Sequence, residues 1–333
     1  MDKLGSLSQS FQIHNQKATL TAVGDVTLGY DAYHLQPILD KLAKEEEKKA
    51  FDYPFLRVRD HFDGIVFCNL EGTLTESNKR VSKKFSFKAR PKYVRCLSEA
   101  GFDIVSLANN HAMDFSVSGL EDTIKALDSQ GIKHVGAGMN LREARQGVSI
   151  YENSVLVHCL AYSLIGPSSI FASGDSAGTA GSYDSGRILR FVQEDISTAK
   201  SDADAIVVSF HWGKEGHHYP TAAQKTLARA TIDAGASVVL GHHPHVLQGI
   251  EEYKSGVIFY SLGNFMFAGN RNPSDKDSII AKIVLDASGV VNYEVIPVKI
   301  ASEQNYQPYV LDGDEKQRVL NRLKEYSSKI KAM

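Results

Sequence analysis

The chain has 333 residues, of which 43% are apolar and 23% are charged, and its formal net charge is −2. This is the composition of a folded globular protein, so it excludes a wholly disordered chain, and the length allows a large core without disulfide bonds. With positive and negative charge nearly balanced, nothing in the overall composition indicates a protein that binds nucleic acid or a membrane surface.

Short apolar runs rich in β-branched residues alternate with helical patterns along most of the chain. In chain order these patterns predict strands at 17–23, 64–68, 104–107, 134–135, 155–160, 205–210 and 237–240, and helices at 36–49, 91–100, 118–130, 186–200 and 221–234. Antiparallel strands are predicted at 256–260, 278–285 and 290–298, and a charged helix at 312–331. Strand–helix alternation followed by strand pairs predicts a layered α/β sandwich.

Two segments lack a clear hydrophobic period. Residues 166–185 are rich in Gly, Ser, Ala and Asp, which predicts a long loop, either a surface segment or a lid. Residues 257–267 contain Gly263 and Asn264, which predicts a strand followed by a turn rather than a longer apolar element.

The N-terminus and the cysteines bear on where the protein works. Residues 1–16 contain no apolar run of signal-peptide length, and no apolar stretch approaches the roughly 20 residues that a membrane span needs. Cys68, Cys96 and Cys159 are odd in number and far apart, which is typical of buried thiols in a reducing compartment. We therefore expect a cytoplasmic protein without a membrane anchor.

Polar residues follow the ends of five predicted strands, and six of the twelve histidines fall within 211–245. Ligands of open α/β sheets bind beyond the carboxyl ends of the strands. Carboxylate and amide oxygens with imidazole nitrogens, and no thiolate, favour Mn, Fe, Zn or Mg/Ca over copper or iron–sulfur. The residues at the five strand ends are Asp25; Asn69 and Glu71; Asn110 and His111; His211; and His243 with His245.

Each of these residues also has an ordinary explanation. A single Asp or His after a strand is more often a cap or a turn former than a ligand. The pair His243 and His245 is a stronger signal, because Pro244 fixes the backbone so that alternate residues can face one site. His217, His218 and His242 are interpreted as bystanders beside these ligands.

A basic run at 79–95 carries eight cations and no acid. Charge runs are usually solvated surface, which is one interpretation. The other is that the run meets an anionic substrate at the metal site, because it directly follows the Asn69–Glu71 loop. Arg80, Lys88 and Arg90 are the candidate substrate-binding residues in this run.

Six motifs, in this order along the chain, resemble the CapA family of poly-γ-glutamate capsule synthesis proteins, which are related to calcineurin-like metallophosphoesterases. The resemblance covers about residues 18–300. The motifs are GDVTLG at 24–29, NLE at 69–71, SLANNH at 106–111 with Asp114, HWGKE at 211–215, GHHPHVLQ at 241–248 and YSLGNF at 260–265.

The resemblance implies a four-layer α/β/β/α sandwich with one or two divalent ions, Mn, Fe or Zn rather than Mg or Ca. The metallophosphoesterase-like domain would span 17–305, between an N-terminal extension at 1–16 and a C-terminal helix at 306–333. It implies that Asp25 and His245 bind a first metal, that Glu71 bridges, and that Asn110, His211 and His243 bind a second. His111 would be the acid/base and Asn69 a supporting catalytic residue, while Thr27, Trp212 and Glu215 would contact substrate.

This sequence departs from the phosphoesterase pattern at two positions. Thr27 stands where those enzymes have a metal-binding histidine, and Glu71 stands where they have a bridging aspartate. The resemblance therefore implies a first metal site that is short of one nitrogen ligand.

Three functions are compatible with these residues. The first is a metal-dependent hydrolase that uses activated water on a phosphoester or on a peptide or γ-glutamyl amide. The second is a metal-dependent peptide epimerase that abstracts an α-proton. The third is a non-catalytic protein that binds poly-γ-glutamate. In each case the partner is an anionic small molecule, peptide or polyglutamate, and not nucleic acid.

Overall fold

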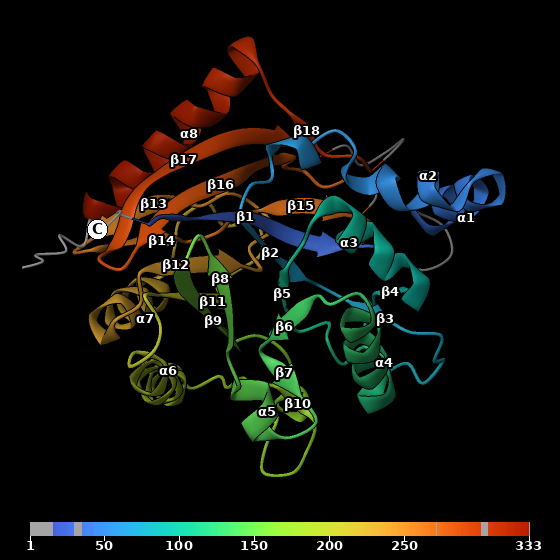
Figure 1. Ribbon diagram of the computed structural model, residues 1–333, viewed down its shortest axis with the longest axis horizontal. Coiled ribbons are helices and arrows are strands. Elements are labelled where there is room, and N and C mark those ends of the chain that lie inside the picture. The colour runs from blue at the N-terminus through green and yellow to red at the C-terminus, as the bar shows by residue number, and fades with distance from the viewer. Residues whose placement is uncertain (1–15, 30–34, 271, 301–305, 333) are drawn as a thin grey trace, which may run out of the picture.

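The structure is a computed structural model that describes residues 16–29, 35–270, 272–300 and 306–332. Nearly all of the predicted N-terminal extension, 1–16, lies outside the described residues. Two β-sheets stack face to face, and helices cover their outer faces (Figure 1). This arrangement confirms the predicted four-layer α/β/β/α sandwich.

The first sheet has eight strands. In spatial order they are β18 (Tyr309–Val310), β17 (Gly289–Lys299), β16 (Asp277–Asp286), β1 (Ala18–Thr27), β2 (Ile65–Leu70), β5 (Ile104–Ser106) and β6 (Lys133–Val135), with β15 (Asn264–Phe267) beside β1. The run from β1 through β6 is parallel, whereas β16, β17 and β18 are antiparallel to their neighbours. β15 pairs in parallel with the carboxyl end of β1, which sets Asn264 opposite Asp25.

The second sheet has six strands. In spatial order they are β13 (Ile250–Tyr253), β14 (Gly256–Phe259), β12 (Val238–His242), β11 (Ala205–His211), β9 (Val155–Ser163) and β8 (Val148–Glu152). The four central strands are parallel and the two edge strands are antiparallel. Two small pairs complete the strands: β3 (Thr73–Leu74) with β4 (Lys88–Ala89), and β7 (Ala137–Gly138) with β10 (Gly178–Thr179).

The helices lie on the outside of this sandwich. The α-helices are α1 (Leu35–Glu45), α2 (Glu47–Asp52), α3 (Arg95–Ala100), α4 (Ser116–Ser129), α5 (Leu141–Arg145), α6 (Ser185–Ala199), α7 (Ala222–Ala234) and α8 (Gly313–Ala332); the 3₁₀ turns are η1 (Tyr53–Phe55), η2 (Arg59–His61), η3 (Pro91–Val94) and η4 (Ser168–Ile170). α1 to α4 pack on the first sheet, and α6 and α7 pack on the second. The C-terminal helix α8 runs alongside β17 (Figure 1).

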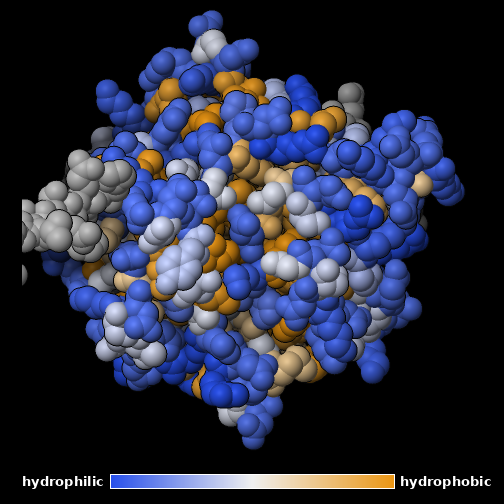
Figure 2. Space-filling view, in the orientation of Figure 1, coloured by the Kyte–Doolittle hydropathy of each residue, from blue (hydrophilic) through white to orange (hydrophobic). Residues whose placement is uncertain are grey.

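Alternate side chains of the central strands build the inner and outer cores. Leu20 and Ala22 of β1 belong to the apolar cluster between the two sheets, whereas Val23 and Val26 belong to the cluster under α1 to α4. This division follows from strand geometry, in which successive side chains point to opposite faces. Hydrophilic residues cover most of the face in Figure 2, with apolar residues in the hollows between them.

Several local predictions need correction. The predicted helix at 36–49 is two helices, which meet at the extended residue Glu46 (φ −160°, ψ 120°). The break lets α2 turn away from α1 and pack against α3. The start of the predicted helix at 91–100 is the 3₁₀ turn η3, the predicted loop 166–185 contains η4 and β10, and the predicted turn at Asn264 begins strand β15.

The carboxyl ends of strands from both sheets meet at one end of the sandwich. Asn69, from β2, donates a 2.9 Å hydrogen bond from Nδ2 to Asp25 Oδ1 on β1. His211, the last residue of β11 in the other sheet, places Nε2 2.8 Å from Asn110 Oδ1. The two sheets therefore bring the predicted strand-end residues to one place.

None of the described helices is long and apolar enough to cross a membrane. The cytoplasmic location expected from the sequence stays a prediction.

Candidate metal centre

Asp25, Glu71 and His245 form the inner part of the strand-end cluster. Asp25 is near the end of β1, Glu71 directly follows β2, and His245 lies in the turn after β12. Both carboxylates are fully buried. Each of the three residues offers a ligand atom, and these atoms all lie within 4.8 Å of one another. They therefore satisfy the geometric requirement for sharing one metal ion.

Glu71 is the most unusual residue of this group, because neither carboxylate oxygen has a hydrogen-bond partner among the described residues. The Nε2 atoms of His111, His211 and His245 lie 3.8, 3.9 and 3.8 Å from Glu71 Oε1, too far for hydrogen bonds. Burial raises the pKa of Glu71 to about 8 against the opposing charge of His245, and the charge of Asp25 also raises it. A buried carboxylate ringed by imidazoles without a donor fits a bound cation.

Asp25, by contrast, is held as a carboxylate. Besides the bond from Asn69, it accepts a 3.4 Å hydrogen bond from the His243 backbone amide and lies 3.1 Å from His245 Nδ1. Burial alone would raise the pKa of Asp25, but His242 and His245 hold it well below its usual range. The hydrogen bond from Asn69 therefore orients the Asp25 carboxylate.

His242, which the sequence interpretation left as a bystander beside the ligands, lies directly beside Asp25. Its side chain is buried, with Nδ1 3.3 Å from Asp25 Oδ1, and neither ring nitrogen makes a hydrogen bond within the described chain. His242 is therefore part of the wall of the centre.

His211, Asn110 and His243 lie together beside Glu71. Nδ1 of His211 is 3.4 Å from Asn69 Nδ2, and its ring centroid is 4.8 Å from that of His243. Burial and the neighbouring His243 lower the pKa of His211 well below its usual value. Burial and His245 lower the pKa of His243 to about 3. Both imidazoles are therefore neutral near pH 7, the form in which histidine binds metals.

The turn that carries His243 and His245 is conformationally unusual. Both residues have positive φ angles, +94° and +57°, which non-glycine residues seldom adopt. Pro244 lies between them, and their ring centroids are 5.7 Å apart. Such conformations cost free energy and gather at functional sites. The structure thus brings together the two histidines that flank the proline.

His111 lies at the same centre with its own acidic partner. Its Nδ1 donates a 2.7 Å hydrogen bond to Asp114 Oδ2, and Phe87 stacks on its ring with centroids 3.9 Å apart. Burial lowers the pKa of His111, although Asp114 opposes this effect. Asp114 fixes the imidazole so that Nε2 faces Glu71.

Lys83 is the residue of the basic run that reaches the centre, and the sequence did not single it out. Its Nζ donates hydrogen bonds to Asp114 Oδ1 (2.6 Å) and to the Asn110 backbone oxygen (2.8 Å), and lies 3.3 Å from His111 Nδ1. The only sequence signal for it was membership of the run of eight cations.

The three basic residues chosen from that run have local contacts instead. Arg80 bonds to Ser86 and the Lys83 backbone, Lys88 to Ser77 and Asn78, and Arg90 to Asp40. None of these contacts involves the centre within the described ranges. A role for these cations in binding substrate stays a prediction.

Two other predicted substrate contacts are buried. Trp212 is 1% exposed, stacks on Phe210 with centroids 4.6 Å apart, and donates from Nε1 to the Tyr260 backbone oxygen. Thr27 is also 1% exposed, and its hydroxyl donates to the Gly29 backbone oxygen. Neither side chain offers surface to a substrate, so both expectations are corrected: these residues shape the loops around the centre.

Asn109 and Asn264 were quoted in motifs but given no role, and both hold residues of the centre. Asn109 donates from Nδ2 to Asn69 Oδ1 (3.0 Å) and accepts from the His111 backbone amide (3.0 Å). Asn264 places Oδ1 2.9 Å from His245 Nδ1. Partners of this kind orient metal-binding side chains.

Comparison with known families matches residues 19–269 to the family described as bacterial capsule synthesis protein PGA_cap. The chain is 33% identical to the capsule biosynthesis protein CapA of Bacillus anthracis, over 95% of this chain and 75% of that protein. It is 31% identical to the PGA biosynthesis protein CapA of Bacillus subtilis (strain 168), over 92% of this chain and 77% of that protein. Among solved structures, a putative 5'-nucleotidase from Staphylococcus aureus aligns with a TM-score of 0.48 at 13% identity, covering 93% of this chain and 58% of that chain.

Proposed function

The chain belongs to the bacterial capsule synthesis protein PGA_cap family, and we propose that it is a metal-dependent hydrolase that cleaves an amide bond in an anionic, glutamate-containing substrate. The names of the two Bacillus relatives refer to capsule and PGA biosynthesis, which supports a γ-glutamyl peptide or polymer as the substrate class. A phosphoester is the alternative substrate for the same centre.

Glu71 carries this proposal. Its two oxygens are buried without a donor, and three imidazole nitrogens stand just beyond hydrogen-bonding distance of Oε1. Burying an ionised carboxylate destabilises the folded state by several kcal/mol unless a cation compensates the charge. His245 is the nearest cationic side chain, and at 3.8 Å its Nε2 is too far from Glu71 Oε1 for a hydrogen bond, so a divalent metal ion between the carboxylate and the imidazoles is the group that fits.

The residues that would hold one or two ions are those predicted from the strand ends. Their oxygens and neutral imidazoles, without thiolate, suit Mn, Fe or Zn. A bound ion of this kind supplies Lewis acidity, which activates water and polarises a carbonyl or phosphoryl oxygen. The proposed ligands are Asp25, Glu71, Asn110, His211, His243 and His245.

His111 is the proposed acid/base. Asp114 accepts a hydrogen bond from Nδ1–H of His111, so Nε2 is the atom that can exchange a proton with a substrate in the centre. Lys83 donates to the other oxygen of Asp114 and so fixes the carboxylate in place. In amide cleavage, the protonated Nε2 would donate its proton to the departing nitrogen, because an amide ion is a poor leaving group.

The function is tested by incubating the Mn²⁺-loaded full chain with poly-γ-glutamate in H₂¹⁸O. Hydrolysis predicts new amino termini and one ¹⁸O atom in each new carboxylate. The variant His111→Ala should lose about 10²–10⁴-fold in kcat, the usual contribution of a general acid/base. The control His61→Ala, in η2 and apart from the centre, should keep full activity.

The other outcomes separate the competing functions. Deuterium incorporation from D₂O without cleavage would favour the epimerase. Cleavage of a phosphodiester but not of the polymer would favour the phosphoester. Tight polymer binding that survives EDTA, with no turnover of either substrate, would contradict a hydrolase and favour the binding protein.

A further inference from the structure

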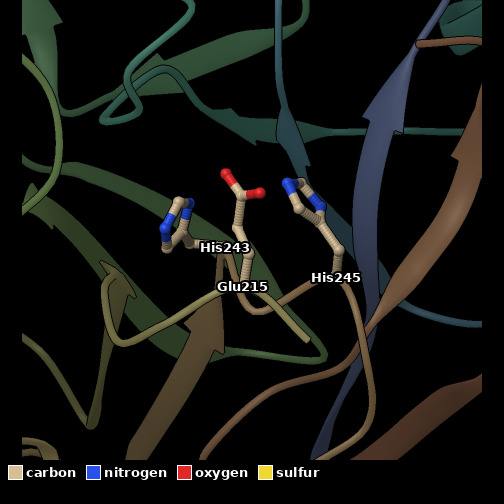
Figure 3. A group of neighbouring side chains, drawn as sticks. All are labelled: Glu215, His243 and His245. Carbon is tan, nitrogen blue, oxygen red and sulfur yellow. The ribbon is translucent and has the colours of Figure 1, made fainter. Parts of the chain in front are cut away.

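Glu215 is a second feature of the centre that needs explanation. It lies in the loop that follows β11, and its side chain is exposed. Its carboxylate lies between the imidazole rings of His243 and His245 (Figure 3). Ligand atoms of these three residues all lie within 4.8 Å of one another. They form a group distinct from Asp25 and Glu71, and the two groups share His245.

Two polar groups of this outer group, the Glu215 carboxylate and Nδ1 of His243, lack hydrogen-bond partners within the described residues. Across the described parts of the chain, the Glu215 carboxylate makes no hydrogen bond or ion pair. Nδ1 of His243 is buried and makes no hydrogen bond to any described residue. An exposed carboxylate alone would be satisfied by water, but the buried imidazole nitrogen beside it would not.

The loop that carries Glu215 is tied to the histidine turn on both sides. The Gly216 amide donates a 2.8 Å hydrogen bond to the Pro244 oxygen, and the Trp212 amide donates a 3.1 Å bond to the His242 oxygen. The buried Trp212 ring anchors the start of the loop. Glu215 is therefore presented to the two histidines by a fixed backbone, which a metal site requires.

We propose that Glu215 is a metal ligand, which together with His243 and His245 holds a divalent ion at the exposed side of the centre. This inference rests on the proposed metal-dependent function and deepens it. Two imidazoles and one carboxylate are a donor set that suits Zn, Mn or Fe.

The charge of Glu215 favours this role over direct contact with the substrate. The proposed substrate is anionic, and a bare carboxylate at the entrance would repel it. An ion between Glu215 and the histidines would cancel that repulsion and attract the substrate instead. Glu215 then helps to hold the metal ion and, with its charge cancelled, lets the anionic substrate approach the centre.

The experiment is a calorimetric titration of the metal-free full chain with Mn²⁺ alone, with no substrate present. Loss of a partner outside the coordination shell already weakens metal affinity about 10–100-fold, so loss of a direct ligand should cost at least as much. Glu215→Gln, which keeps the shape and removes the charge, should therefore weaken one Mn²⁺ binding step at least about tenfold. Glu215→Asp, which keeps the charge, should bind more tightly than Glu215→Gln.

Glu294→Gln is the matched control, because Glu294 is an exposed glutamate on β17. It should titrate like the wild-type chain. Wild-type binding of Mn²⁺ with an unchanged Glu215→Gln titration would overturn this inference and leave the proposed function standing. If the wild-type chain itself binds no Mn²⁺, the proposed function falls as well.

Discussion

Among the described residues, the buried acidic side chains at two places have their charges balanced in different ways. In the first, which we name the α8 cluster (Asp275, Asp277, Arg318 and Arg322), Arg318 forms two 2.7 Å hydrogen bonds with Asp277. Arg322 donates to Asp275 at 2.8 Å and also bonds to Asp277. In the second group, at the proposed metal centre, Glu71 is fully buried and accepts no hydrogen bond from the described residues.

The difference distinguishes a cluster that holds the fold together from the cluster that we propose to bind a metal ion. The α8 cluster is complete within the chain, and it fixes helix α8 to the start of β16, where Asp277 is the first residue. The centre is incomplete, because its imidazoles are held near Glu71 without bonding to it. Paired buried charges are satisfied within the chain, whereas a buried carboxylate without a donor either stays protonated, as the raised pKa of about 8 indicates for metal-free Glu71, or binds a cation.

The largest expected effect removes the unpaired charge. Glu71→Gln should weaken Mn²⁺ binding at least about 100-fold, because it removes a negatively charged carboxylate that would bind the cation directly. Calorimetric titration of the full chain with Mn²⁺ measures this. An affinity within threefold of wild type would show that Glu71 is not a metal ligand. The missing hydrogen bonds of Glu71 would then not indicate a metal site.

The paired charge should respond in stability instead. Asp277→Asn leaves Arg318 and Arg322 without their shared partner, and it should lower the free energy of unfolding by about 1.5–3 kcal/mol, the usual worth of charged hydrogen bonds. Urea denaturation measures the change. Mn²⁺ binding should be unaffected, so a weakened metal titration in this variant would contradict the separation of the two clusters.

Glu71→Gln should have the opposite effect on stability in the metal-free protein. Burial raises the pKa of Glu71 to about 8. Ionisation of this side chain therefore lowers the free energy of unfolding of the metal-free chain. With EDTA present near pH 8, the neutral variant should be more stable than wild type by on the order of 1 kcal/mol. A loss of stability in urea would mean that Glu71 has donors in the metal-free chain.

Acid should remove the contribution of the α8 cluster. Burial alone would raise the pKa of Asp277, but Arg318 and Arg322 lower it below its usual value. The carboxylate therefore stabilises the fold above the unfolded-state pKa of about 3.9, and this contribution is lost as the pH falls below it. The stability difference between wild type and Asp277→Asn, measured in urea, should be constant from about pH 7 to 5 and shrink towards pH 3. A difference that grows in acid would contradict the assignment.

The positions of the central residues were predictable because of sheet geometry. Parallel strands end at one edge, so Asp25, Glu71 and His211 could be expected to meet, although they lie far apart in the sequence. The helix predicted at 221–234 is α7, and local residues set both of its ends: Thr221 forms a capping box with Gln224, and Gly235 has φ +122°. Local patterns and topology together were sufficient for these parts.

Contacts made by irregular segments were not predictable. Lys83 comes from a loop without periodicity, and its place depends on Asp114, 31 residues away. Nothing in the run of adjacent histidines tells which of them face inward, because that depends on strand β12 continuing to His242 and on the positive φ of His243. The break of the predicted 36–49 helix likewise depends on packing against α3, which helical periodicity does not encode.

We propose that the buried Glu71, which accepts no hydrogen bond from the described residues, marks a divalent metal site. Its most direct test is anomalous X-ray diffraction from crystals of the full chain grown with Mn²⁺ or Zn²⁺, with data collected on both sides of the metal edge. We expect an anomalous peak beside Glu71, within reach of His211 and His245. A metal-supplied crystal with no peak there would contradict it.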